Sequence, residues 1–322
     1  MPAPRILLVK LSSLGDVVHL LPAVTDLAAW APQAEIAWAV ESAYAELVRL
    51  HSAVARAIPV PLRRLRDAPL SPAAWKAVRA SRAALREQAW DYVVDAQGLL
   101  KSACVSRWAR SVAFGPDASS ARERLAARFY DVKIAVERGI HAVERNRILL
   151  AQVFGYATQG PARYGLAAPA ERPSWAPSGR YAVLLHAASR ADKRWPDERW
   201  TALAKRMAAD GYALVFPGGS EAERRAAGRL AHAVGDAAIA APPMTLAEAA
   251  ALLAHASGVV GVDTGLTHLA VALAVPTVGI YCATSPQLTG LHGEAVANLG
   301  GPGAPPDVEA VARAAGIGPA AA

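Results

Sequence analysis

The sequence predicts an α/β fold made of two Rossmann-like domains that face each other across a cleft. Short apolar runs alternate with longer Ala-rich segments of helical period, an alternation typical of parallel sheets with right-handed crossovers. The chain has 322 residues, which is long for one core and comfortable for two domains. The segment 166–180 is rich in Pro and small residues and lacks an apolar period, so it predicts a linker.

The elements follow in order from these runs. The expected strands are Ile6–Val9, Ile36–Val40, Tyr92–Asp95, Tyr181–His186, Ala213–Phe216, Val259–Val262 and Thr277–Tyr281. The expected helices include Trp75–Gln88, His141–Phe154, Glu198–Asp210 and Leu246–Ala254. Pro22 suits the first position of a helix better than its interior, which predicts one turn at Val17–Leu21 and a helix from Pro22.

Domain boundaries follow from the breaks in this pattern. We place an N-terminal domain at 1–172 and a C-terminal domain at 173–305. After the break "GGPGAPP", a final helix within 306–322 is expected to pack back on the N-terminal domain.

Composition indicates a globular protein, with 53% hydrophobic residues and ordinary charge density. Cys104 and Cys282 lie far apart without metal-type spacing, which fits a reducing compartment. The apolar part of the N-terminus is too short for a signal peptide, and no run is long enough to span a bilayer. We therefore expect a soluble cytoplasmic protein.

The net charge of +7 is unevenly distributed. Residues 1–172 hold 23 Lys and Arg against 15 Asp and Glu, whereas residues 173–322 hold 11 against 12. This asymmetry suggests that the N-terminal half contacts something anionic: nucleic acid, an acidic membrane surface or a phosphorylated substrate. A solvated, Arg-rich surface without a partner is the alternative.

Several common motifs are absent. No G-x-G-x-x-G follows a strand and no G-x-x-x-x-G-K-[ST] occurs, which argues against a dinucleotide-dependent oxidoreductase and an ordinary P-loop NTPase. There is no Asp-x-Asp metal clamp, no histidine cluster and no G-x-S-x-G elbow. We therefore expect a site without a metal or a redox cofactor.

The turn "KLSSLGD" after the first strand is the first candidate site. Ser12, Ser13, Gly15 and Asp16 could form a phosphate cradle, present a catalytic carboxylate, or only cap a helix with Asp16 as the N-cap. The two hydroxyls, the glycine and the carboxylate offer more polar chemistry than a cap requires.

Two turns in the C-terminal half are candidate phosphate-binding sites, one because of its cations and the other because it begins a helix. "HAASRADKRWP" presents Ser189, Lys193 and neighbouring Arg residues, which suit a phosphate, or form a solvated loop with an Asp192–Arg pair. "VDTGLTHLAVAL" places Asp263 and His268 at the start of a helix whose amides can bind an anion, although capping alone explains the Asp.

The turn "FPGGSEAE" places Glu221 and Glu223 at the start of another helix. A carboxylate there can accept both ribose hydroxyls, while a surface Glu on an Arg-rich helix is the simpler interpretation.

Together, "KLSSLGDVVHLLPAV", "DAQGLLKSA", "HAASRADKRWP" and "VDTGLTHLAVAL" resemble the lipopolysaccharide heptosyltransferases of glycosyltransferase family 9, which have the GT-B fold. The resemblance runs from about residue 4 to about residue 290, and "DAQGLLKSA" points to type I. It implies metal-independent, inverting transfer of L-glycero-D-manno-heptose from ADP-L-glycero-D-manno-heptose to the inner Kdo of Kdo2-lipid A. It also implies a peripheral enzyme on the anionic cytoplasmic face of the inner membrane, without nucleic acid.

The resemblance also assigns residues. Asp16 falls on the general base and Lys193 on the lysine that binds donor phosphate, so both are expected to be catalytic. The donor-binding set is Ser13, Ala188, Ser189, Lys193, Glu223, Met244, Asp263, Thr264, Gly265, Leu266 and His268, with Glu223 at the ribose and Met244 at the adenine. The acceptor-binding set is Arg63, Arg64, Arg66, Lys101 and Arg122. Ala188 departs from the Thr of related enzymes, while Ser189 keeps the neighbouring hydroxyl.

Two alternatives stay open at this point. Within the same class, the chain could be a type II heptosyltransferase or another ADP-sugar transferase. In a different class, it could be a non-catalytic nucleotide- or nucleic-acid-binding α/β protein, although four Phe and eight Tyr give few residues for base stacking.

Overall fold

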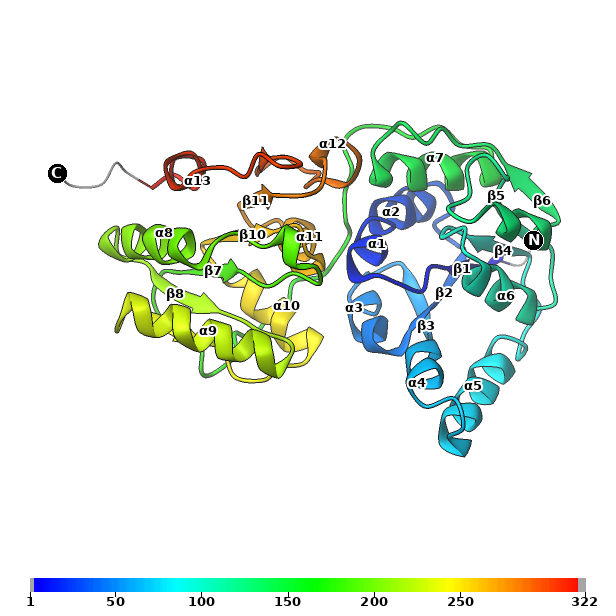
Figure 1. The fold of residues 1–322 in the computed structure, drawn as a ribbon. Coiled ribbons are helices and arrows are strands. Elements are labelled where there is room, and N and C mark those ends of the chain that lie inside the picture. The colour runs from blue at the N-terminus through cyan, green and yellow to red at the C-terminus, as the bar shows by residue number, and fades with distance from the viewer. Residues whose placement is uncertain (1–2, 318–322) are drawn as a thin grey trace. The chain divides into compact units, whose positions relative to one another are not determined.

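The computed structural model describes residues 3–317 and divides into two compact units, Met1–Ala167 and Ala168–Ala322 (Figure 1). The division lies inside the predicted linker at 166–180, a few residues before the predicted boundary. Residues 318–322, the end of the predicted terminal segment, lie outside the described residues.

The first unit is built on a six-stranded sheet in which all neighbouring strands are parallel. Its order is β3-β2-β1-β4-β5-β6. The strands are β1 (Arg5–Val9), β2 (Glu35–Glu41), β3 (Val54–Val60), β4 (Tyr92–Asp95), β5 (Ala113–Pro116) and β6 (Val132–Ile134). β1 is buried from Ile6 to Val9, since the inner strands of a parallel sheet are buried on both faces.

The helices of this unit connect and cover the strands. They are α1 (Leu14–Val18), α2 (Leu21–Trp30), α3 (Ala45–Val48), α4 (Leu62–Asp67), α5 (Pro72–Ala84), α6 (Leu100–Trp108) and α7 (Ala142–Phe154), with 3-10 turns η1 (Ser42–Tyr44) and η2 (Arg124–Phe129). α2 packs against α7, α5 against β3, and α6 against β4.

The second unit repeats this plan with a parallel sheet in the order β12-β11-β10-β7-β8-β9. Its strands are β7 (Tyr181–Leu185), β8 (Ala213–Phe216), β9 (Ala238–Ala240), β10 (Gly258–Val262), β11 (Thr277–Tyr281) and β12 (Val296–Gly300). Its helices are η3 (Ala191–Lys193), α8 (Asp197–Ala209), α9 (Glu221–Val234), α10 (Leu246–Ala254), α11 (Gly265–Ala272), α12 (Pro286–Thr289) and α13 (Val308–Ala314). Trp195 and Trp200 lie in its buried core.

Each sheet has one point where the strand order reverses, and this determines where a site forms. In the first sheet the chain proceeds outward from β1 to β3 and then outward from β4 to β6 on the other side. In the second sheet the same reversal occurs between β7 and β10. Loops that leave the carboxyl ends of two such strands diverge and leave a crevice, where ligands of open α/β sheets bind.

All seven predicted strands are present to within one residue at each end, so the α/β prediction is confirmed. The pattern missed β3, β5, β6, β9 and β12. Four of these are the edge strands of the two sheets, where burial is incomplete and the apolar signal is weak. β3 also contains Pro59, which sheets accept mainly at an edge.

The first helix differs from the prediction. α1 begins at Leu14 with Ser13 as its N-cap, so the expected turn at Val17–Leu21 lies closer to the N-terminus and Asp16 is not the cap. Asp16 is the third residue of α1. Pro22 does lie in the first turn of α2, as predicted.

The terminal helix also differs from the prediction. α13 packs against α8, β11 and β12 within the second unit, so the expectation that it packs on the N-terminal domain is wrong. Val311 and Ala312 are fully buried in the core of the second unit, so the apolar face of α13 is already covered there. In the described part of the chain, no helix has the length and apolar character needed to cross a bilayer.

Candidate active site

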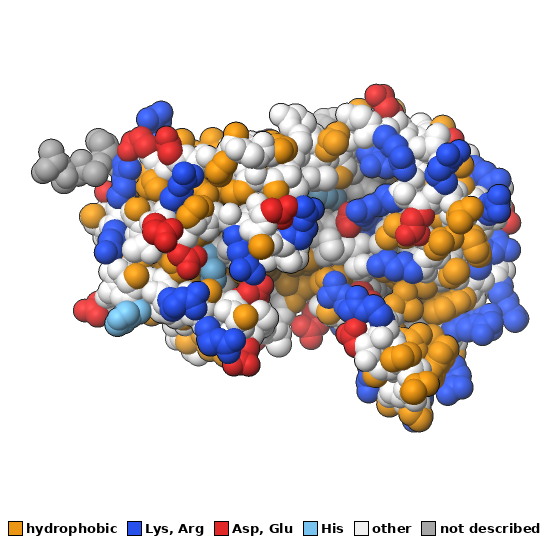
Figure 2. All heavy atoms as spheres, in the orientation of Figure 1, with side chains coloured by type: hydrophobic (Ala, Val, Ile, Leu, Met, Phe, Trp, Pro, Cys, Tyr) orange, Lys and Arg blue, Asp and Glu red, His pale blue; other side chains and the backbone are white. Residues whose placement is uncertain are grey.

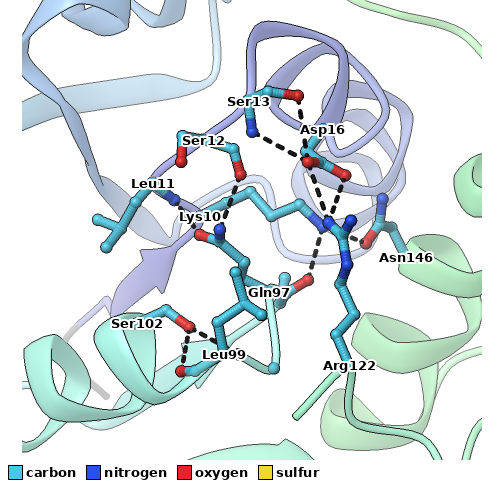
Figure 3. A network of polar contacts seen from close by, with 12 residues as sticks. Lys10, Leu11, Ser12, Ser13, Asp16, Gln97, Leu99, Ser102, Arg122 and Asn146 are labelled. Carbon is cyan, nitrogen blue, oxygen red and sulfur yellow. Dashed lines mark hydrogen bonds and ion pairs between the residues drawn. The ribbon is translucent and has the colours of Figure 1, made fainter. Parts of the chain in front are cut away.

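Asp16 is the centre of a polar cluster at the carboxyl end of β1 (Figure 3). Its Oδ2 accepts hydrogen bonds from the Ser13 backbone N–H at 2.9 Å and from the Ser13 hydroxyl at 3.3 Å. Nη1 of Arg122, from the loop before η2, donates to both carboxylate oxygens at 3.1 Å. The Asp16 side chain is only 25% exposed. The loop therefore fixes the direction of one partly buried carboxylate.

Charges around Asp16 decide its ionisation. Burial alone would raise its pKa, but the positive charges of Lys10 and Arg122 and the hydrogen bond from Ser13 outweigh burial and lower the pKa below the usual range. Asp16 is therefore a carboxylate at neutral pH, and a weak base.

Lys10 is a functional candidate that the sequence analysis did not single out. It is 6% exposed, and its Nζ donates to the Ala96 carbonyl at 2.7 Å and to Asn146 Oδ1 at 3.2 Å. Burial lowers the pKa of Lys10 to about 8, although the charge of Asp16 opposes the shift. The available signal was its place directly after β1, where a lysine in an apolar run is unusual.

We expect Lys10→Met to raise the pKa of Asp16, because the substitution removes a cation that favours the ionised carboxylate. An NMR titration of the Asp16 carboxyl carbon measures this directly and needs no substrate. Lys76→Met, which removes an exposed lysine from α5, is the matched control and should leave the titration unchanged. An identical Asp16 titration in both variants would contradict this prediction.

The loop after β4 joins the same cluster. Gln97 binds the backbone on both sides of the Leu11–Ser12 peptide, and Lys101 Nζ donates to the Ser12 hydroxyl at 2.7 Å. The structure thus brings Ser13, Asp16, Lys101 and Arg122 together, and adds Lys10 and Gln97. Gln97 lies in the stretch "DAQGLLKSA", but nothing in the sequence shows that its side chain reaches the loop after β1.

The other predicted acceptor residues lie elsewhere in the first unit, on α4. Arg63 donates to the Tyr44 hydroxyl at 2.6 Å and its backbone N–H to Glu41 at 3.2 Å. Arg66 pairs with Asp67 at 2.8 Å. Arg64 is exposed on the same helix. These arginines therefore lie together on α4, where Arg63 is partly fixed by Tyr44 and Glu41.

In the second unit, Asp263 is the centre of a second cluster, at the carboxyl end of β10. Its Oδ2 accepts from Lys193 Nζ at 2.7 Å and from the Thr284 hydroxyl at 2.7 Å, and Oδ1 lies 3.5 Å from His268 Nε2. Burial would raise its pKa, but the hydrogen bonds from His268, Lys193 and Thr284 and the Lys193 charge lower it strongly. Asp263 therefore orients Lys193 and does not merely cap α11, whose N-cap is Thr264. Thr284, in the loop between β11 and α12, was not predicted.

The remaining donor-set residues of the second unit lie at the start of α11, in the loop after β7, on α9 and before α10. Gly265 and Leu266 begin α11. Ala188, Ser189 and Glu223 line one cavity of about 460 Å³. The carboxylate of Glu223 accepts from the backbone N–H groups of Gly219 and Ser220 at 2.9 and 2.8 Å, so it caps α9. Met244 lies in the loop between β9 and α10. Within residues 3–317, no three His, Cys, Asp or Glu side chains gather as a metal site requires.

A model of glycosyltransferase family 9 (heptosyltransferase) matches residues 78–314. The chain belongs to glycosyltransferase family 9. Lipopolysaccharide heptosyltransferase 1 of Pseudomonas aeruginosa is 44% identical over 304 residues, which cover 92% of this chain and 83% of that protein. Lipopolysaccharide heptosyltransferase 1 of Escherichia coli (strain K12) is 42% identical over 294 residues, which cover 90% and 91%.

Solved structures agree with this family assignment. E. coli heptosyltransferase WaaC with ADP has a TM-score of 0.89 at 40% identity, covering 96% of this chain and 98% of that one. The same enzyme with ADP-2-deoxy-2-fluoro heptose gives 0.86, also at 40% identity and the same coverage. The resemblance noted in the sequence is confirmed: this member of family 9 is a glycosyltransferase, and the alternative of a non-catalytic binding protein is set aside.

Proposed function

We propose that this family 9 enzyme transfers L-glycero-D-manno-heptose from ADP-heptose to the inner Kdo of Kdo2-lipid A, with inversion at the anomeric carbon. One observation carries the proposal. Each sheet has a polar cluster where its strand order reverses. The first cluster contains the carboxylate of Asp16, and the second contains Lys193 and the start of α11. The likeness to an enzyme solved with ADP and with an ADP-heptose analogue supports the donor.

In this proposal Asp16 is the general base. Inverting transfer needs a base for the acceptor hydroxyl and a stabilised leaving group, with an oxocarbenium-like transition state. Lys10 and Arg122 keep Asp16 ionised and make it a weak base. It therefore accepts the proton late, after bonding to the anomeric carbon has made the attacking oxygen acidic.

The second cluster stabilises the departing ADP. Lys193 supplies a positive charge, and the free amides at the start of α11 supply oriented dipoles for the diphosphate. Asp263 holds Lys193 in place, with Thr284 and His268 on the same carboxylate. A backbone amide near Ala188 and the Ser189 hydroxyl replace the contact that a Thr side chain would make.

The test is release of ADP from ADP-heptose with two acceptors. We expect turnover with Kdo2-lipid A and none with an acceptor that already carries the first heptose. The reverse preference would indicate a type II enzyme. If ADP is not released with either acceptor, the enzyme uses another sugar acceptor.

We also propose that the enzyme works on the anionic surface of the inner membrane, and that α4 and α5 contact it. Residues 62–84 hold six basic residues and one acidic residue. Leu70 is 94% exposed and Trp75 is 46% exposed. Apolar and basic side chains gather over this part of the first unit (Figure 2). The indole N–H of Trp75 already donates to the Pro69 carbonyl, so an apolar ring faces outward, which suits a lipid interface.

Neutralising two exposed arginines tests the membrane contact. Each cation at an anionic surface contributes about 1 kcal/mol, so Arg64→Gln with Arg66→Gln should weaken binding to anionic vesicles about 30-fold and raise the KM for the acceptor. The binding should also fall with added salt. Lys205→Gln with Arg313→Gln makes the same charge change on the second unit and should have little effect. Equal vesicle binding and acceptor KM in both variants would exclude this surface.

A further inference from the structure

Gln97 is a buried side chain whose two polar atoms both bind the backbone of the loop after β1, one on each side of the Leu11–Ser12 peptide. It is 4% exposed. Its Oε1 accepts from the Leu11 N–H at 2.6 Å, and its Nε2 donates to the Ser12 carbonyl at 2.7 Å. The Leu11 N–H and the Ser12 carbonyl therefore depend on a residue 86 and 85 positions away.

Gln97 is itself held firmly. Its backbone N–H donates to Asp95 Oδ1 at 2.7 Å, and the other oxygen of this fully buried carboxylate accepts from the Tyr130 hydroxyl at 2.7 Å. Gly98 follows at φ +68°, and a Cβ there would lie 2.9 Å from Cγ of Pro116. The backbone that carries Gln97 therefore has little freedom to move.

The chain of contacts leads from Gln97 to Asp16. Gln97 fixes the carbonyl of Ser12, and the next residue, Ser13, donates its N–H and its hydroxyl to Asp16. Figure 3 shows Gln97 below Ser12 and Ser13, with the carboxylate of Asp16 beside Ser13. A displacement of the Ser12 peptide would move the donors that aim the Asp16 carboxylate.

We propose that Gln97 is a positioning residue for heptosyl transfer, which holds the Leu11–Ser13 backbone so that Ser13 aims the carboxylate of Asp16. Gln97 acts through the backbone and touches neither sugar. The inference rests on the proposed role of Asp16 as the base.

Gln97→Met is the decisive variant, because it keeps the length of the side chain and removes both hydrogen bonds. We expect kcat to fall about 100-fold, the loss that follows when a reacting group is displaced by about 1 Å. The Kd for ADP-heptose should change far less than kcat, because every residue of the donor-binding set except Ser13 lies in the second unit. Gln97→Glu keeps the acceptor for the Leu11 N–H but cannot donate to the Ser12 carbonyl. Its kcat should lie between those of wild type and Gln97→Met. Gln88→Met removes a glutamine that bonds Glu35 in the same unit and is the matched control.

A double variant separates positioning from a merely structural role. If Gln97 acts through Asp16, Gln97→Met should reduce transfer by less than about threefold in an Asp16→Asn background, because coupled residues are not additive. The proposal would be overturned if the losses in transfer rate of the two single variants multiply in the double variant. It would also be overturned if Gln97→Met loses as much affinity for ADP-heptose as it loses kcat, or if it keeps the wild-type kcat. Thermal unfolding of each variant shows whether activity is lost because the protein unfolds. If Gln97→Met unfolds, the kcat of Gln97→Glu is the test of the proposal. Full activity of Asp16→Asn alone would instead refute the proposed base.

Discussion

Asp16→Asn is expected to reduce heptosyl transfer by about 10²–10⁴-fold, the contribution of a general base, while ADP-heptose binds as before. The asparagine can still accept from the Ser13 N–H, so the loop keeps its conformation, but it cannot take a proton. The measurements are single-turnover transfer and donor Kd by titration calorimetry. Asp16→Ala should give the same loss of transfer.

The control for this variant is Asp67→Asn, which neutralises an exposed carboxylate of the same unit that pairs with Arg66. It should keep transfer near the wild-type rate. A fall in donor binding parallel to the fall in transfer, or a loss below about tenfold, would remove Asp16 from the role of base.

Lys193→Met should have the second large effect, with kcat/KM for ADP-heptose falling about 10²–10³-fold, as when one donor to a developing oxyanion is lost. Lys193 is the cation of a mostly enclosed pair, with the lysine side chain 18% and the Asp263 side chain 10% exposed. Its removal also takes away one of the contacts that lower the pKa of Asp263, so that pKa should rise.

Steady-state kinetics with varied ADP-heptose and ADP binding by calorimetry measure this effect. Lys205→Met, on the exposed side of α8, is the control. Lys193→Arg keeps the charge but changes its shape and reach, and should recover only part of the activity. Wild-type donor affinity and turnover in Lys193→Met would contradict the assignment.

The sequence could predict the inner strands and the turns that follow them. Runs such as Tyr181–Leu185 are apolar throughout because both faces of the sheet are buried, and this leaves a strong local signal. The turns after β1, β7 and β10 contain the central residues of both clusters, Asp16, Lys193 and Asp263. The edge strand β6 lacks this signal, because none of its residues is fully buried.

Partners across the fold could not be predicted, because they depend on strand order. Thr284 and Gln97 are ordinary polar residues in sequence, and only the neighbouring positions of β10 with β11 and of β1 with β4 bring them to Asp263 and to the loop after β1. Asp16 was predicted as a helix cap or a base. Its pairing with Arg122, a residue 106 positions away, was likewise invisible in the sequence.

The strand order has a consequence for the time at which these sites form during folding. β1 can pair with β2 soon after both are synthesised, but its other neighbour, β4, lies much later in the chain. The hydrogen bonds that Lys10 and Leu11 make with Ala96 and Gln97 span 86 residues each, and Lys193 reaches Asp263 across 70. Contacts of such sequence separation form only after long loops have closed. A chain interrupted after β3 could therefore hold its first three strands together and still lack an ordered loop around Asp16.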